Sequence, residues 1–211
     1  MRKEYIMLGD GGHSDVCRDV AQKMGYVETG FVLKNELDRN SPNSINNFLG
    51  TDEWLFEKGP DKSLLINGIG GTAGSKIREK IFSKYSSRGF KFLTLIHPSA
   101  QIVDSVILEH GVQIMAGVII QPNCKIKKNS IINTRSSIDH DCVVEENVHI
   151  APGVILCGNV IVKKRAFVGA AACIIPSLII GDSAIIGAGS TVLNNVPANT
   201  TYVGKQLSEE R

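Results

Sequence analysis

The chemistry that the sequence offers centres on five histidines, one of which, His140, is followed directly by a carboxylate, Asp141. A carboxylate next to an imidazole raises its basicity and fixes its orientation. The pair suits a general base that takes a proton from an attacking nucleophile. A solvated histidine among acidic residues is the alternative that these residues alone leave open.

The elements that must position this pair belong to a six-residue repeat. Sixteen residues spaced by six are all Ile, Leu or Val: Ile102, Leu108, Ile114, Ile120, Ile126, Ile132, Ile138, Val144, Ile150, Leu156, Val162, Val168, Ile174, Ile180, Ile186 and Val192. This period fits neither a helix nor a simple strand. It predicts short strands joined by tight corners, three to each 18-residue triangular coil, with coils about 4.8 Å apart. Bulky rings do not fit such a stack, and ten of the twelve aromatic residues precede residue 101.

The repeat over residues 102–197 resembles the hexapeptide signature of the left-handed parallel β-helix acyltransferases. That resemblance implies a prism-shaped domain, a homotrimer, and acetyl-CoA or another acyl thioester as co-substrate. We assign residues 98–211 to this domain, with the tail after Pro197 as a C-terminal cap. The period places Cys124 and Cys142 one coil apart, where we expect two buried thiols rather than a disulfide.

Within the repeat, His140 occupies the third position of its hexad, at or near a corner. Gly158 follows 18 residues later, which places it one coil above and leaves room for a bound thioester. His149 lies nine residues on, so it faces another side, where it can donate a hydrogen bond to an acetyl carbonyl or to pantetheine. Ala170 and Ala188 stack with each other and predict a groove for an extended pantetheine arm. Corners that merely prefer small residues explain this column equally well.

Residues 1–97 predict a small Rossmann-like α/β domain with a parallel sheet. Strands are expected at 5–8, 30–33, 64–69 and 90–96, helices after Ser14 and over 75–85, and a polar loop over 35–50. The glycine turn Gly9-Asp10-Gly11-Gly12-His13 follows the first strand, where such sheets receive phosphate groups. The dinucleotide pattern GxGxxG is not met, which favours a nucleotide-linked small molecule over NAD.

The combined motifs resemble the sugar O- and N-acetyltransferases that include the bacillosamine-pathway enzyme and sialic acid O-acetyltransferase. The matching features are Gly-Gly-His at 11–13, Gly70, Leu95-Ile96-His97-Pro98, Asn133-Thr134, Ile138-Asp139-His140-Asp141, His149 and Val203-Gly204. The resemblance implies His140 as the base and Asp141 as the group that raises its basicity. It implies acetyl-CoA contacts from His149, Gly158, Ala170 and Ala188, and nucleotide-sugar contacts from Gly11, Gly12, His13, Gly70 and Asn133.

Two departures from that family bear on the ligands. The family places Asp-Asp after the second strand, near the nucleotide base or ribose, whereas this chain has Leu33-Lys34. The base is therefore open between UDP, GDP and CMP. The family's Val-Gly-x-Pro-Ala tail is replaced by Val203-Gly204-Lys205-Gln206-Leu207, which affects the wall over the adenine end of CoA.

Composition argues against several other classes of protein. The 23 basic and 21 acidic residues nearly balance, which argues against nucleic acid or an anionic membrane as a partner. No apolar run is long enough to span a bilayer, the start is too short for a signal peptide, and five cysteines without a CxxC pair argue against a disulfide scaffold. We expect a cytoplasmic protein.

The sequence therefore predicts an acetyl-CoA-dependent N-acetyltransferase acting on a nucleotide-linked 4-amino-4,6-dideoxy sugar. Acetylation of a hydroxyl on a sialic acid or related sugar is the nearest alternative. A non-enzymatic β-helix that binds a nucleotide sugar is a third. A zinc hydratase like the γ-class carbonic anhydrases is disfavoured, because the spacings of His110, His140 and His149 are not multiples of 18 and the HxxxxH pair is absent. No metal is expected.

Overall fold

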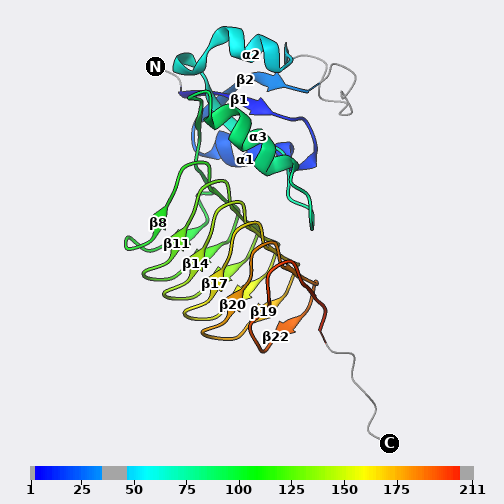
Figure 1. The fold of residues 1–211 in the computed structure, drawn as a ribbon. Helices are drawn as coiled ribbons and strands as arrows, with labels where there is room; N and C mark the ends of the chain where they lie inside the picture. The colour runs from blue at the N-terminus through cyan, green and yellow to red at the C-terminus, as the bar shows by residue number, and fades with distance from the viewer. Residues whose placement is uncertain (1–2, 35–46, 205–211) are drawn as a thin grey trace, which may run out of the picture.

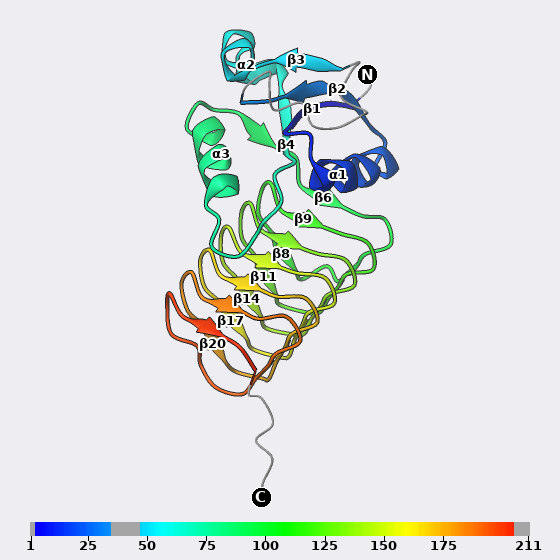
Figure 2. The ribbon, with the colours of Figure 1, turned by 90° about the vertical axis from the view of Figure 1, so that its right-hand side faces the viewer.

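The computed structural model describes residues 3–34 and 47–204. A small α/β domain sits on one end of a triangular prism of stacked coils, and the chain runs along the prism to its far end (Figures 1 and 2). The predicted fold class, an α/β domain followed by a left-handed parallel β-helix, is confirmed. Most of the predicted polar loop over 35–50 and the tail from residue 205 lie outside the described residues.

The N-terminal domain contains one parallel sheet with strand order β3-β2-β1-β4-β5. Its strands are β1 Lys3–Leu8, β2 Tyr26–Val32, β3 Phe48–Gly50, β4 Leu64–Asn67 and β5 Lys91–Phe92, and its helices are α1 Gly12–Lys23, α2 Asp52–Lys58, η2 Pro60–Lys62 and α3 Ile77–Ser86. Alternate residues of β1 divide between two cores. Met7 packs with α1, whereas Leu8 packs with α2 and α3, so helices cover both faces of the sheet.

One local prediction in this domain is wrong, and two short elements were missed. The single strand expected over 90–96 is two strands, because β5 joins the N-terminal sheet while β6, Leu95–Ile96, is already the first strand of the prism. The prism therefore begins one hexad before Ile102. The short strand β3 and the seven-residue helix α2 were not predicted, since neither is long enough to display a periodic pattern.

The prism consists of three parallel sheets, which we call faces 1, 2 and 3. Face 1 contains β6 Leu95–Ile96, β9 Gln113–Ile114, β12 Ile131–Ile132, β15 His149–Ile150, β18 Phe167–Val168, β21 Ile185–Ile186 and β23 Thr201–Tyr202. Face 2 contains β7 Gln101–Ile102, β10 Ile119–Ile120, β13 Ser137–Ile138, β16 Ile155–Leu156, β19 Cys173–Ile174 and β22 Thr191–Val192. Face 3 contains β8 Ile107–Leu108, β11 Lys125–Ile126, β14 Val143–Val144, β17 Ile161–Val162 and β20 Ile179–Ile180.

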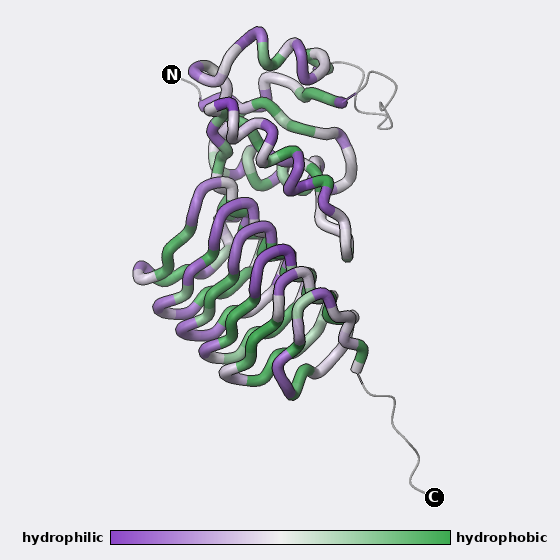
Figure 3. Tube along the Cα trace, viewed as in Figure 1, coloured by the Kyte–Doolittle hydropathy of each residue, from purple (hydrophilic) through white to green (hydrophobic). Residues whose placement is uncertain are grey.

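The repeat holds its register through the prism. Ile138 pairs with Ile120 on one side and Leu156 on the other, each 18 residues away. These first-position side chains point inward and are fully buried from Ile114 to Val192. Each buried aliphatic side chain stabilises the fold by about 1.5–3 kcal/mol before conformational entropy is counted. Hydrophilic and hydrophobic segments recur at the same place in successive coils (Figure 3).

From Gly111 to Gly189 each corner is turned by a residue with positive φ at the fourth position of a hexad. Asp141 (φ 61°) and Asn159 (φ 60°) are two examples, and Gly153 (φ 69°) is a third. Asn, Asp and Gly tolerate this left-handed conformation better than other residues do. The period of six therefore carries a second signal, a turn residue that lies three positions before each inward aliphatic.

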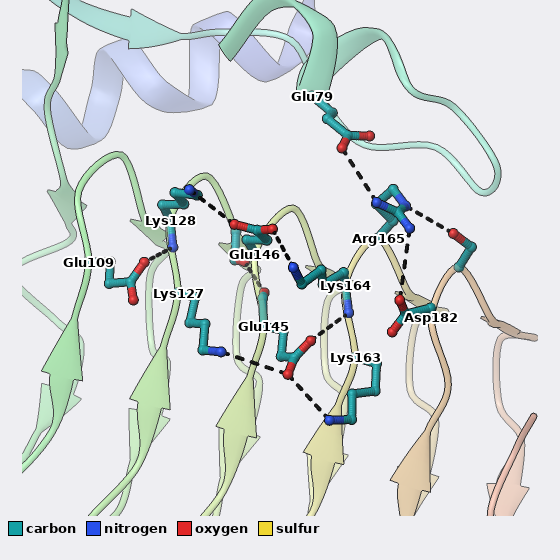
Figure 4. A network of polar contacts seen from close by, with 12 residues as sticks. Glu79, Glu109, Lys127, Lys128, Glu145, Glu146, Lys163, Lys164, Arg165 and Asp182 are labelled. Carbon is teal, nitrogen blue, oxygen red and sulfur yellow. Dashed lines mark hydrogen bonds and ion pairs between the residues drawn. The ribbon is translucent and has the colours of Figure 1, made fainter. Parts of the chain in front are cut away.

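The corner between faces 3 and 1 carries a ladder of ion pairs (Figure 4). Charge sign alternates from coil to coil, with Glu145 and Glu146 each lying between lysines of the coils above and below. The ion pairs are Lys127–Glu145 (3.7 Å), Lys163–Glu145 (3.4 Å), Lys128–Glu146 (3.1 Å) and Lys164–Glu146 (3.0 Å). The residue after Lys164, Arg165, forms an ion pair with Glu79 of α3 (3.7 Å). This ion pair links the prism to the N-terminal domain.

The described residues bear on two further expectations. All five cysteines are free, and both Cys124 and Cys142 are buried, as expected from their position in the repeat. Among the residues that the structure describes, no helix combines the length and apolar character needed to cross a membrane.

Candidate active site

The corner between faces 2 and 3 presents His140 and Asp141 to solvent. His140 Nδ1 lies 2.8 Å from Asp141 Oδ2, and the two side chains are 58% and 50% exposed. Asp141 also accepts a hydrogen bond from Asn123 Nδ2 (3.1 Å) on the coil before. The side chain of Asp139 accepts from the backbone N–H of His140 (2.8 Å). The dyad is therefore anchored at both ends while its outer edge stays open.

The electrostatics of this corner favour a basic imidazole. The hydrogen bond to Asp141, and next the charge of Asp139, raise the pKa of His140 above its usual value. The same hydrogen bond and that from Asn123 lower the pKa of Asp141. Because Nδ1–H donates to the carboxylate, the lone pair of His140 lies on Nε2, where a general base needs it.

Gly158 covers the imidazole from the next coil. A Cβ placed on Gly158 would lie 2.6 Å from His140 Cε1 and 2.7 Å from Nε2. No side chain fits there without moving the ring, so the glycine keeps the Nε2 edge free. Gly158 therefore stacks on His140, as the 18-residue period predicts.

A second histidine cluster lies on face 1, under the N-terminal domain. His13 of α1 lies with Nε2 2.8 Å from Gln113 Oε1, and Gln113 Nε2 donates to the carbonyl of Asn67 (2.8 Å). Gly70 lies against His13, since a Cβ on this glycine would lie 3.2 Å from His13 Cβ. Burial, and then the charge of Arg78, lower the pKa of His13 to about 4.

His149 projects from β15 of the same face. Its ring packs against Phe167 with centroids 5.1 Å apart, and Gly71 lies directly over Nδ1. Burial, followed by the charges of Arg78 and His13, lowers the pKa of His149 to about 3. His149 is therefore neutral at physiological pH.

The other residues that the sequence predicts for the site lie in the N-terminal domain and at a different corner of the prism. Gly11 lines a cavity of about 620 Å³ in the N-terminal domain, together with Lys34, Lys80, Lys84 and Asp10. Gly12 begins α1 and is exposed. Asn133, Ala170 and Ala188 lie at the corner between faces 1 and 2, where both alanines are exposed.

One chain thus brings His140, Asp141 and Gly158 together, and separately His13, Gly70 and His149. It does not bring the first set to Ala170 and Ala188, which occupy a different corner. Sequence reasoning missed Gln113, Gly71 and Arg78 in the second cluster, and Lys80 and Lys84 in the cavity. The helical spacing of Lys80 and Lys84, four residues apart, was the only sequence signal for any of them.

No group of three or more His, Cys, Asp or Glu side chains suited to a metal ion occurs within residues 3–34 and 47–204.

Comparison with known proteins finds a family match for the N-terminal region and solved structures that match the whole fold. The PglD N-terminal domain model matches residues 4–85. UDP-N-acetylbacillosamine N-acetyltransferase of Bacillus subtilis (strain 168) is 32% identical over 125 residues, which cover 54% of this chain and 52% of that protein. The match thus spans about half the length of this curated relative.

Solved structures match over nearly the full chain. A histidine-to-asparagine variant of perosamine N-acetyltransferase from Caulobacter crescentus, in complex with CoA and GDP-perosamine, is 32% identical with a TM-score of 0.85, covering 96% of this chain and 93% of that one. The acetyltransferase domain of PglB from Neisseria gonorrhoeae FA1090, in complex with acetyl coenzyme A, is 28% identical with a TM-score of 0.84, covering 97% of both chains. Together with the dyad and the prism, these matches show that the chain belongs to the hexapeptide-repeat family of sugar acetyltransferases.

Proposed function

We propose that this protein transfers the acetyl group of acetyl-CoA to the amino group of a nucleotide-linked 4-amino-4,6-dideoxy sugar. The observation that carries the proposal is the His140–Asp141 dyad, whose free Nε2 edge faces the space under Gly158. It occurs in a chain that resembles a CoA- and GDP-perosamine-bound N-acetyltransferase over almost its whole length.

The dyad supplies the proton transfer that the reaction needs. The uncharged amine attacks the thioester carbonyl, forming the new C–N bond and a tetrahedral oxyanion. His140 Nε2 takes the proton that the nitrogen must lose, and Asp141 stabilises the resulting imidazolium. The C–S bond then breaks, and the CoA sulfur leaves as a thiolate that takes up a proton. His149, held neutral, donates a hydrogen bond to the oxyanion.

The co-substrate fits the residues that are present. Acetyl-CoA supplies an activated acetyl group, and the side-chain-free position of Gly158 leaves room for a thioester beside His140. The exposed alanines Ala170 and Ala188 form a column of small side chains that an extended pantetheine arm can follow.

The cavity of about 620 Å³ suits the nucleotide. Its volume falls within the range of pockets that enclose small organic ligands. Lys80 supplies positive charge for a diphosphate, beside Lys84, which forms an ion pair with Asp52 of the same cavity. Gly11 and Gly12 let the backbone approach the diphosphate closely. In this proposal His13, Gly70 and Asn133 contact the sugar.

We further propose that the active site is shared between copies in a homotrimer. The dyad lies at the corner between faces 2 and 3, whereas His149 and the N-terminal domain lie on face 1. A neighbouring copy brings these two parts together. Ile155 and Ile179 are 48% and 40% exposed on the outer surfaces of faces 2 and 3, and an interface would cover such side chains. Five free thiols support a reducing compartment, the cytoplasm.

The test is an assay with acetyl-CoA and a panel of GDP-, UDP- and CMP-linked 4-amino-4,6-dideoxy sugars, followed by mass spectrometry of the sugar product. Acetylation of the amine of at least one member is expected. Matched 4-hydroxy sugars and a sialic acid run in parallel as acceptors. Transfer only to hydroxyls would replace the proposal with an O-acetyltransferase, and calorimetry without any acetyl-CoA binding would leave a non-enzymatic binding protein.

A further inference from the structure

A buried arginine stands behind His149. Arg78 of α3 is 7% exposed, and its guanidinium donates to three backbone carbonyls: Nη1 to Asn67 O (2.9 Å) and Ile69 O (2.7 Å), and Nε to Asn129 O (3.2 Å). Among the described residues no carboxylate forms an ion pair with it, and its Nη2 is buried without a hydrogen-bond partner. Since a buried N–H group without a partner costs free energy, this atom calls for an acceptor.

The ring of His149 offers a matching atom. Its Nδ1 is likewise buried without a hydrogen-bond partner, and a Cβ on Gly71 would lie only 2.2 Å from it. The other ring nitrogen, Nε2, is not among the buried unpartnered atoms, and His149 as a whole is half-buried. The accessible edge of the imidazole is therefore the Nε2 edge, and Nδ1 faces inward.

Both side chains line one small cavity of about 40 Å³, together with Thr72, Ser75, Asn147 and the ion pair of Glu79 with Arg165. A water molecule needs roughly 10–15 Å³ of such space and two or more polar partners, so the cavity can hold one or two. A water here can accept from Arg78 Nη2–H and donate to His149 Nδ1. That arrangement satisfies both orphaned atoms at once.

We propose that Arg78 is a positioning residue that, through a water in this cavity, holds His149 as the neutral tautomer with its proton on Nε2. A guanidinium only donates hydrogen bonds, so the water that it orients uses a lone pair toward Arg78 and has both hydrogens free to donate, one of them to Nδ1. The positive charge of Arg78 also opposes a proton on the nitrogen that faces it. The accessible Nε2–H is then a fixed donor for the oxyanion; this step rests on the proposed acetyl transfer.

The primary test is 15N NMR of His149 in the full-length protein without substrates, with the resonance assigned by its loss in His149→Gln. A protonated Nε2 and an unprotonated Nδ1 are expected at pH 7. A protonated Nδ1, or a doubly protonated ring, in the wild-type protein overturns the proposal whatever any variant does. Because this measurement needs no turnover, an expected spectrum in a protein that acetylates nothing would sink only the proposed function.

Substitution adds a second test. Arg78→Met removes charge and donors, and we expect a mixed tautomer at His149 and a kcat lowered roughly 10- to 100-fold, with KM for acetyl-CoA little changed. Arg78→Lys, which keeps a cationic donor, is expected to recover the Nε2–H tautomer and most of the kcat. A folded Arg78→Met with an unchanged tautomer and kcat contradicts the proposal, as does a loss confined to KM.

Discussion

The two histidine regions of this chain, the dyad corner of His140 and the face-1 cluster of His149, differ in every property that sets imidazole chemistry. His140 is 58% exposed and hydrogen-bonded to a carboxylate, which raises its pKa. His149 is enclosed beside a buried arginine, which adds to burial in lowering its pKa to about 3. One ring is built to gain a proton and the other to stay neutral.

This difference assigns separate tasks to the two regions. A base must be reached by the proton it removes and must be stable once charged, which the corner provides. A hydrogen-bond donor to an oxyanion works best when it is fixed and shielded from water, which the face provides. Exchanging the two environments would disable both rings, so each is suited to one role only.

Removal of the proposed base, His140, is expected to have the largest effect on activity. We expect His140→Ala to lower kcat by about 10²- to 10⁴-fold, because no other described group replaces its Nε2 at that corner. Steady-state kinetics with the best nucleotide sugar measure the effect. His97→Ala, at the domain junction, serves as the matched control and is expected to remain near wild-type. A fully active His140→Ala would remove the dyad from the mechanism.

The next largest effect on activity is expected from a substitution that crowds the imidazole ring of His140. Gly158→Ala places a methyl group about where His140 Nε2 must meet the substrate, and we expect kcat to fall by about 10²-fold. Because Gly158 does not need a positive φ, the melting temperature is expected to change little. Thermal unfolding measured beside the kinetics separates the two effects. A large loss of stability with normal kcat at low temperature would refute the steric argument.

Asp141→Asn tests, through the pH dependence of activity, how the carboxylate affects the pKa of His140. Asp141 raises the pKa of His140, and the base acts only when neutral, so activity is lost as pH falls through that raised value. The substitution lowers the pKa, which moves the acidic limb of kcat/KM to lower pH, while the weaker base lowers the plateau by about 10-fold. A pH–rate profile of both proteins decides it. An unmoved limb would assign the titration to another group.

Mixing the two regions between copies tests whether they act across an interface. A trimer that contains both His140→Ala and His149→Ala chains has, in either stoichiometry, one site in three that combines an intact His140 with a neighbour's intact His149. We expect co-expressed, doubly tagged trimers to recover roughly a third of wild-type kcat. Homotrimers of each variant are the controls. Activity no higher than theirs would place both histidines of a site in one chain.

The prism was predictable because its information is local and repeated. Inward aliphatics such as Ile138 recur every six residues, and the same arithmetic puts Gly158 over His140. The α/β domain was harder, since helix α2 is a single short segment without a repeating pattern. The environment of His149 was not predictable at all. It depends on Arg78 of helix α3 and on Gly71 of the loop before it, which precede His149 by 71 and 78 residues and reach face 1 only in the folded chain.

The left-handed corner at Asp141 has a consequence for how this chain can change. At most corners the residue only has to turn the backbone, so Asn and Gly are interchangeable there, and drift between them leaves the coil intact. At Asp141 the same backbone conformation also presents the carboxylate to His140. This residue must therefore both turn the corner and support the base. A coil that loses this acid keeps its shape, and the protein would remain folded and able to bind its ligands with a weaker base. The prism therefore offers a route by which catalysis can decline while the fold persists.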